Sequence, residues 1–429
     1  MLKINSLSRG LYFSLFSFIN RGISFVLLLI LAKFINPAEY GYLSLFNTII
    51  MLLTYFRSMS MEGYFSIAYF EKGEDGLKQT FSSLFYTSIF MLFFFFFFIL
   101  IFKEKSVSIL NLPFSIVSLT IIIVFFQLYI DLNLDYFRIF DKIKKYGAYS
   151  CGGAILNFIL SIFFVKQLML GWEGRVYAQL FCCFCLGLFS LLFFIKRRFL
   201  VLPDIKYFKH VLFWGIPLIP HLATTFIRQG CDRYIINAAY SIEDVGLFSF
   251  ALTLMGIITM IGYGFNQANS VEVYRILGNK ELSVDDKCEK LISNIKTLIR
   301  IYTFSSFLVV IFCSCIIPHI LPQYSGAITY FIPLSIYGYG VCLYLIYVNF
   351  LFYYKKTHLI MVITISSAII HLLLSLILTK YSLHFTSLIY IITQILVVFI
   401  IRRQAVKILM IKGINISFKS NEETCNNRA

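Results

Sequence analysis

An apolar stretch at residues 214–234, WGIPLIPHLATTFIRQGCDRY, is interrupted by charged side chains and by two prolines. Guanidinium, imidazole and carboxylate groups of this kind bind anions, exchange protons or form ion pairs. At about 100° per residue, His221, Thr225, Arg228 and Asp232 fall on one face of a helix here, and Pro217 lies on the same face. The segment predicts a helix bent at its prolines, with a polar stripe that lines an aqueous, positively charged chamber.

The charged residues of this stripe also have a structural explanation. Arg228 and Asp232 are four residues apart, so they can pair on one helix. Both lie near the predicted end of the apolar run, where long side chains reach the membrane interface. Arg57 closes another apolar run, where interfacial anchoring is the simpler role. Cavity lining and structural contact therefore both stay open for these three residues.

A single arginine near the start of the chain is harder to explain by pairing. Arg21 has apolar residues on both sides and no acidic residue within a turn or two. An arginine at the centre of a bilayer costs about 2.5–3.5 kcal/mol on insertion scales, so such a residue faces water or a partner. Arg21 is therefore predicted to face an anion.

The composition places these residues in a membrane protein. Of 429 residues, 59% are hydrophobic and only 14% are charged, well outside the range of soluble domains. Runs of about 20 apolar residues cross a bilayer. The sequence predicts twelve such spans in an all-α membrane protein, near 11–35, 41–61, 81–102, 112–134, 147–167, 175–195, 212–239, 244–268, 298–317, 326–352, 358–379 and 384–401.

The net charge of +16 reports orientation rather than nucleic-acid binding. With the N-terminus inside, 27 of the 37 Lys and Arg residues fall on the inner side and 8 on the outer side. This is the positive-inside pattern, and it leaves no single basic face for a nucleic acid. Both termini are predicted to be cytoplasmic, and membrane lipids are the expected surroundings.

The twelve spans divide into two halves that share weak landmarks. Gly41 and Ser44 match Gly246 and Ser249 at an offset of 205 residues. A second match, at an offset of 214, aligns two pairs: Asn157 with His371 and Ser161 with Ser375. Parallel repeats of this kind enclose a central cavity in many transporters. We expect two six-helix lobes around such a cavity, 1–200 and 201–429, the second with a short cytoplasmic tail.

Motifs of catalysis and of metal binding are missing from the sequence. It has no Walker glycine loop, no H-E-x-x-H and no nucleophile elbow. Its cysteines fall mostly in apolar spans, and the cluster CCFC has no zinc-ligand spacing. The sequence therefore predicts neither an enzyme nor a bound metal or cofactor.

Three stretches carry a resemblance to a known family: FINPAEYGYLSLF at 34–46, FWGIPLIPHLATTFIRQGCDRYIINAAYSIEDVGLFSFAL at 213–252 and ILPQYSGAITYFIPLSIYGYG at 320–340. GWEGRVYA at 171–178 is similar as well. The chain resembles the Wzx-type O-antigen and polysaccharide flippases, a branch of the multidrug/oligosaccharidyl-lipid/polysaccharide exporter superfamily. The resemblance extends over nearly the whole chain.

The resemblance implies a transporter of the bacterial inner membrane that moves undecaprenyl-diphosphate-linked oligosaccharide from the cytoplasmic to the periplasmic leaflet. By position, Arg21, Arg228, Arg57 and Arg233 correspond to the cationic lumen described for the family. A polysaccharide polymerase machinery is a further partner that it suggests. Two alternatives are weighed against it, a MATE-type multidrug or cation antiporter and a membrane polysaccharide polymerase. An antiporter for cations needs buried carboxylates, and a polymerase needs a large outer loop.

Overall fold

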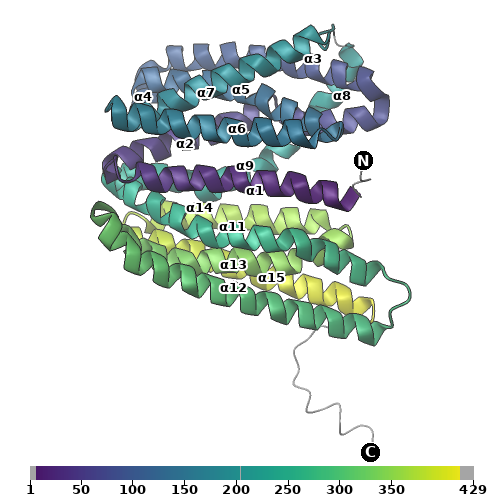
Figure 1. Cartoon of the computed structure of the whole chain (residues 1–429). Helices are drawn as coiled ribbons and strands as arrows, with labels where there is room; N and C mark the ends of the chain where they lie inside the picture. The colour runs from purple at the N-terminus through teal and green to yellow at the C-terminus, as the bar shows by residue number, and fades with distance from the viewer. Residues whose placement is uncertain (1–5, 203, 416–429) are drawn as a thin grey trace, which may run out of the picture. The chain divides into compact units, whose positions relative to one another are not determined.

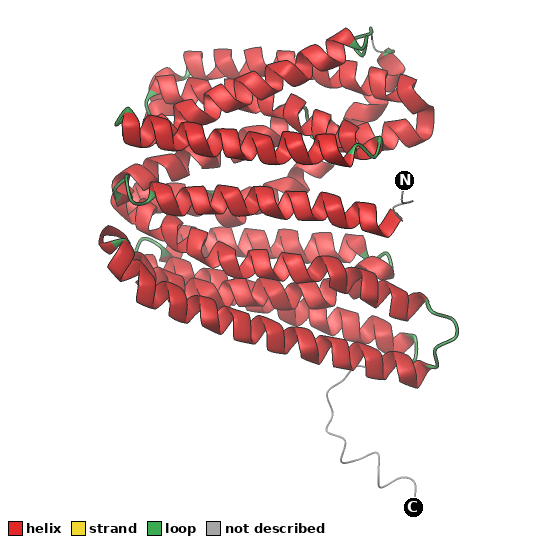
Figure 2. Cartoon of the chain, viewed as in Figure 1, coloured by secondary structure: helices red, strands yellow, loops and turns green. Residues whose placement is uncertain are grey.

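The structure, a computed structural model, describes residues 6–202 and 204–415, with the side chains of 6–11, 14 and 221 left out. Within these residues the chain is helical throughout and forms no strand (Figure 2). Ten of the described helices are long and apolar enough to cross a membrane. The predicted all-α membrane fold is confirmed.

Fifteen α-helices and three short helices of other types follow one another along the described chain (Figure 1). Their bounds are α1 Ser6–Leu31, α2 Pro37–Phe56, η1 Met61–Gly63, α3 Tyr64–Ile101, α4 Lys103–Leu110, α5 Phe114–Ile139, α6 Ile143–Ile162, η2 Phe163–Gln167, α7 Gly171–Lys196, α8 Ile205–Gly215, α9 Leu218–Gln229, α10 Cys231–Ala239, α11 Ile242–Gly278, α12 Val284–Ile320, η3 Pro322–Tyr324, α13 Ala327–Tyr353, α14 Thr357–Leu378 and α15 Leu383–Ile411.

Each of the twelve predicted spans falls on helix. The first two coincide with α1, whose apolar stretch Leu15–Leu31 is shorter than a full span, and with α2, which has 20 residues. The seventh coincides with three helices, α8 to α10, because the chain breaks at Ile216–Pro217 and again at Gly230. The predicted interruption at the prolines is confirmed at Pro217. The second break, at Gly230, was not expected.

Two compact units make up the chain, Met1–Phe250 and Ala251–Ala429. In the first unit, α5 packs against α2, α3 and α7, while α1 packs along α6. Aromatic rings fill the core where α3, α5 and α7 meet, and the rings of Phe81 and Phe194 lie 4.6 Å apart. The predicted boundary near residue 200 stays a prediction.

The start of α11 belongs to the first unit and crosses α2 at two glycines. A Cβ on Gly41 would lie 2.2 Å from the Ile242 carbonyl oxygen, and one on Gly246 would lie 1.7 Å from the Pro37 carbonyl oxygen. Larger side chains would therefore push the helices apart. Three residues further along each helix, the hydroxyl of Ser44 donates to that of Ser249 over 2.7 Å. The residue pairs that the repeat aligned thus touch each other directly.

The second unit is organised around α13. This helix packs against α12, α14 and α15, and its core side chains are almost wholly aliphatic and aromatic. Tyr302, Phe350 and Ile401 are completely buried there. The unit is therefore a bundle held mainly by apolar packing.

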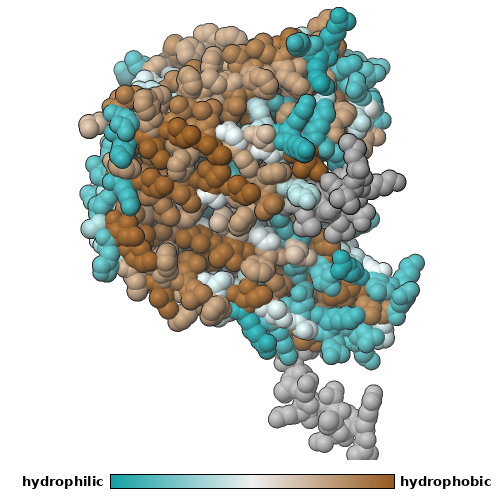
Figure 3. Space-filling view, in the orientation of Figure 1, coloured by the Kyte–Doolittle hydropathy of each residue, from teal (hydrophilic) through white to brown (hydrophobic). Residues whose placement is uncertain are grey.

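Hydrophobic side chains also dominate the surface drawn in Figure 3, over the middle lengths of the helices, and hydrophilic ones gather toward helix ends. Along α3, Phe90, Phe93, Phe97 and Leu100 are all at least 49% exposed. Apolar surface of this extent is stable when lipid covers it. The pattern agrees with a multi-pass membrane protein.

Candidate functional site

The predicted polar stripe of 214–234 is divided between two helices. Thr225 is exposed and Arg228 partly buried on α9, whereas Asp232 is completely buried on α10. The break at Gly230 divides the single helix that the spacing assumed into α9 and α10. His221 lies on α9, and its side chain falls outside the described residues.

Arg233 joins the stripe to the α2 crossing. Its Nη1 donates to the hydroxyl of Thr48 at 3.0 Å and to the Gln229 carbonyl at 2.9 Å. Its Nε donates to Ser249 at 3.3 Å, the serine that accepts from Ser44. Since α2, α10 and α11 all contribute, this guanidinium is held where three helices meet.

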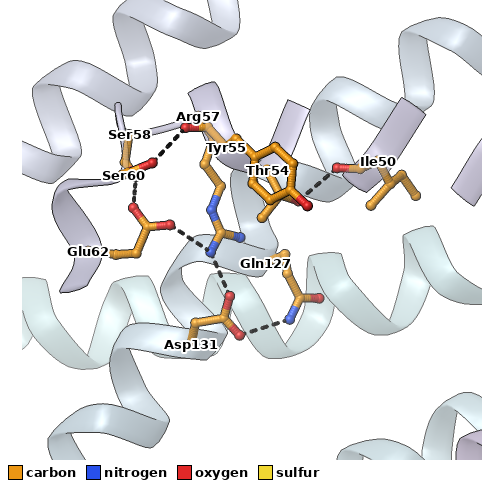
Figure 4. A network of polar contacts seen from close by, with 9 residues as sticks. All are labelled: Ile50, Thr54, Tyr55, Arg57, Ser58, Ser60, Glu62, Gln127 and Asp131. Carbon is orange, nitrogen blue, oxygen red and sulfur yellow. Dashed lines mark hydrogen bonds and ion pairs between the residues drawn. The ribbon is translucent and has the colours of Figure 1, made fainter. Parts of the chain in front are cut away.

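Arg57 is the most completely buried arginine of the predicted site, with 5% of its side chain exposed. Its Nη2 lies 2.7 Å from Asp131 Oδ2 and 3.7 Å from Glu62 Oε1 (Figure 4). Gln127 Nε2 donates to the other oxygen of Asp131 at 3.1 Å, and Ser58 donates to Glu62. We call Arg57, Glu62, Gln127 and Asp131 the Arg57 cluster.

The Arg57 cluster neutralises its arginine with carboxylates from two helices. Asp131 lies on α5, 74 residues along the chain from Arg57. Nε and Nη1 of Arg57 are buried and have no hydrogen-bond acceptor among the described residues. Arg57 also lines a small cavity together with Ser88 and Phe95 of α3. Nη2 of Arg57 is therefore paired with carboxylates, whereas Nε and Nη1 have no partner among the described residues.

A second guanidinium that neighbouring side chains hold was not among the predicted site residues. Arg175, near the start of α7, donates from Nη1 to Asn157 Oδ1 at 2.7 Å and to Ser161 Oγ at 3.1 Å. Both acceptors belong to α6 and are neutral. No carboxylate of the described chain lies within ion-pair distance of it. This set, the Arg175 cluster, keeps its positive charge.

The sequence contained a signal for the Arg175 cluster. Arg175 lies within GWEGRVYA, and Asn157 and Ser161 form one side of the second repeat match. However, Arg175 stood at the predicted edge of its span and counted as an outer-side charge. Its two acceptors lie 18 and 14 residues earlier in the chain, on another helix. Spacing along one helix could not reveal that contact.

Arg21 is exposed on α1, and no hydrogen bond or ion pair joins it to another described residue. Its neighbour Asn20 points the other way, donating to Ser150 Oγ on α6 at 2.8 Å. Contact with α6 is thus made by Asn20, which leaves the Arg21 guanidinium free to meet a ligand or a lipid headgroup.

No group of three His, Cys, Asp or Glu side chains within 6–202 and 204–415 could hold a metal ion. What the first unit does contain is arginine in several settings: exposed (Arg21), held by neutral oxygens (Arg175 and Arg233) and paired with carboxylates (Arg57). Guanidinium groups bind phosphate with two parallel hydrogen bonds, so Arg21 and Arg175, which have no carboxylate partner among the described residues, can receive an anion.

Comparisons with known proteins identify the family of this chain. The model of a family described as "Polysaccharide biosynthesis protein" matches residues 6–269. The Lsg locus protein 1 of Haemophilus influenzae is 25% identical over 368 residues, which cover 81% of this chain and 85% of that protein.

Solved structures show the same fold. An inward-facing multidrug resistance MATE family transporter of the MOP superfamily is 14% identical, with a TM-score of 0.68 over 94% of this chain and 95% of the other. An outward-facing structure of such a transporter gives 0.61 over 95% and 96%, again at 14% identity. This chain is a multi-pass membrane protein that belongs to the polysaccharide biosynthesis protein family.

Proposed function

We propose that the protein is a flippase for undecaprenyl-diphosphate-linked oligosaccharide repeat units, of the kind that build O-antigen or capsule. It moves them by alternating access from the cytoplasmic to the periplasmic leaflet of a bacterial inner membrane. In this proposal both termini are cytoplasmic, and the lobes are 1–200 and 201–429. A polysaccharide polymerase machinery receives the product.

The observation that supports this substrate is the positive charge in the membrane-spanning helices of the first unit. A diphosphate headgroup loses its hydration when it enters such a region, and guanidinium groups offset that loss. Arg21 and Arg175 have no carboxylate partner among the described residues, so their charge is available. Together with Arg57, His221, Arg228, Asp232 and Arg233 they form the proposed binding region.

The membrane potential favours the same direction of transport. A potential that is negative inside drives an anion outward with about 2.3 kcal/mol per charge per 100 mV. An exporter of cations would instead need negative charge among its helices. Asp131 and Asp232 are carboxylates in such positions, but Asp131 is paired with Arg57 over 2.7 Å, and Asp232 is next to Arg233 in the chain.

The test replaces Arg21 and Arg228 with Ala and with Lys in cells that lack the native gene. We expect both Ala variants to lose surface glycan and to accumulate its lipid-linked precursor in the cytoplasmic leaflet. The Lys variants should be intermediate, because an ammonium keeps the charge but not the bidentate contact. Arg403→Ala, at an exposed position of α15, is the control. Normal glycan in both Ala variants at native protein levels would refute the proposal.

A further inference from the structure

The first unit contains a large pocket that the proposed transport does not use. It has a volume of about 650 Å³ and lies among α2, α3, α4, α5, α9 and α10. Its wall is made of aliphatic and aromatic side chains, among them Leu52, Phe98, Ile121 and Phe226. The pocket is open on one side, so a molecule of the surrounding membrane can enter it.

The apolar wall of the pocket offers few hydrogen-bonding groups to a water molecule. Its hydroxyl groups are turned into the protein, Thr120 donating to the Val117 carbonyl at 2.6 Å and Tyr234 to the Leu45 carbonyl at 3.4 Å. A buried water needs two to four polar partners, and an apolar cavity without them stays dry. The occupant is therefore hydrocarbon.

Polar side chains that are free to meet a ligand line the pocket at one edge. There α4, the short helix between α3 and α5, contributes Lys105 and Ser106 to the lining. Lys105 is exposed, as an ammonium at a membrane interface is expected to be. An apolar body with a cationic edge matches a molecule that has a hydrocarbon chain and a phosphate head.

We propose that this pocket binds one acyl chain of an anionic membrane phospholipid, with Lys105 contacting the lipid phosphate. The volume falls within the range of roughly 300–1,000 Å³ seen for ligand pockets, which suits one acyl chain and falls short of a long polyprenyl chain. The surrounding bilayer supplies such lipids in excess. The lining contains none of the residues of the proposed glycolipid-binding region, and the occupant is a resident lipid.

The pocket also approaches the buried side of Arg57. Phe95 and Ile121 line both the large pocket and the small cavity that Arg57 also lines. A lipid chain in the large pocket thus packs against the wall of the Arg57 cluster and keeps water away from it.

The experiment uses the full chain reconstituted in vesicles of phosphatidylethanolamine and phosphatidylglycerol. A phosphatidylglycerol with a photoreactive diazirine on its acyl chain is the probe, and labelled peptides are identified by mass spectrometry. We expect label on residues of α2, α4 and α5 that line the pocket. Even labelling of all exposed helix faces, including Phe90 and Phe93, would overturn the proposal.

Two matched pairs of variants locate the site. Ser106 lines the pocket and Ser108 does not, so Ser106→Trp should lower labelling of the pocket about tenfold while Ser108→Trp leaves it unchanged. Lys105→Glu should lower it by a smaller factor, and Lys103→Glu, outside the lining, should not. Both lysines are exposed, so these changes spare the fold.

Equal labelling in Ser106→Trp and Ser108→Trp would overturn the proposal. Native mass spectrometry of the purified chain identifies the occupant independently. A retained phospholipid supports the proposal, and a retained polyprenyl phosphate contradicts it. Neither readout depends on which glycolipid the transporter carries.

Discussion

The second repeat match aligns residues of α6 in the first unit with residues of α14 in the second unit. The side chains on the two helices contact different groups. In the first, Asn157 and Ser161 hold the guanidinium of Arg175. In the second, the corresponding His371 and Ser375 belong to a neutral network. Its members are His371 with Thr393 at 3.3 Å, Ser375 with Thr379 at 3.2 Å and Thr379 with Thr386 at 2.9 Å.

The same contrast holds for the two units as wholes. The fully buried charged side chains of the described chain, Arg57 and Asp232, both belong to the first unit. The buried polar groups of the second unit are hydroxyls, amides and His371. Burying charge costs more than burying neutral groups, so it is retained where it has a use. This difference supports the proposal that the first unit binds the anionic headgroup, with the second unit serving mainly as scaffold.

The largest expected effect comes from removing a carboxylate in the first unit. Asp131→Asn leaves Arg57 buried without its closest counter-charge. Because Asp131 is partly exposed, we expect a loss of about 1–3 kcal/mol in the free energy of unfolding, less than for a fully buried pair. Thermal unfolding of the purified protein measures it.

An ion pair of the second unit provides the control. Arg275 Nη1 lies 2.8 Å from Glu272 Oε2, and both side chains are exposed. Glu272→Gln should change stability by less than about 0.5 kcal/mol. Equal shifts in the melting temperature for Asp131→Asn and Glu272→Gln would remove the proposed difference between the units.

Neutralising the Arg175 cluster tests its charge. Asn157→Asp places a carboxylate beside the guanidinium, which should lower glycolipid transport about tenfold, or roughly 1.4 kcal/mol, while the protein stays folded. The second unit has no arginine beside its buried Asn349, which donates to Asn266 at 2.8 Å. Asn349→Asp should therefore lower stability instead of transport rate. Full transport by Asn157→Asp would exclude a role for the charge of Arg175.

A smaller effect is expected at Ser161, the second acceptor of Arg175. Ser161→Ala removes one hydrogen bond to a charged group and should cost about 1 kcal/mol of stability. The shift in melting temperature should be smaller in the Asn157→Asp background, where a carboxylate already holds the guanidinium. An unchanged shift would show that Ser161 acts independently of Arg175.

The smallest effect belongs to the neutral network of the second unit. Thr379→Val keeps the shape of the side chain and removes the hydroxyl that joins Ser375 to Thr386. We expect a loss of about 0.5 kcal/mol and unchanged transport, since hydrogen bonds between neutral groups contribute little net stability. A transport defect at normal protein level would show that the second unit also takes part in substrate handling.

Much of the fold could be predicted because membrane-spanning helices are recognisable in the sequence as runs of apolar residues. All twelve predicted spans fall on helices, and the prolines marked the first break in the seventh. The break at Gly230 was missed, since glycine is tolerated within membrane helices and one glycine in an apolar run does not mark a break. It moved Asp232 from the predicted stripe into a buried position.

The site was harder to predict, because its contacts join distant helices. Nothing in the run that ends at Arg57 indicates Asp131, and the two meet only because α2 packs on α5. Arg175 was missed for the same reason. By contrast, the repeat match at Ser44 and Ser249 pointed to two residues that prove to be in direct contact. Internal similarity revealed more of the tertiary structure than the spacing of charges did.

Transport by the purified protein tests the central claim most directly. The protein is reconstituted in vesicles with a fluorescent, diphosphate-linked polyprenyl saccharide, and the fraction that becomes accessible to a membrane-impermeant reagent is followed over time. We predict that Arg21→Ala and Arg175→Gln each slow this movement about tenfold, or roughly 1.4 kcal/mol, while Arg403→Ala does not. Movement at the wild-type rate in both of the first two variants would contradict the account.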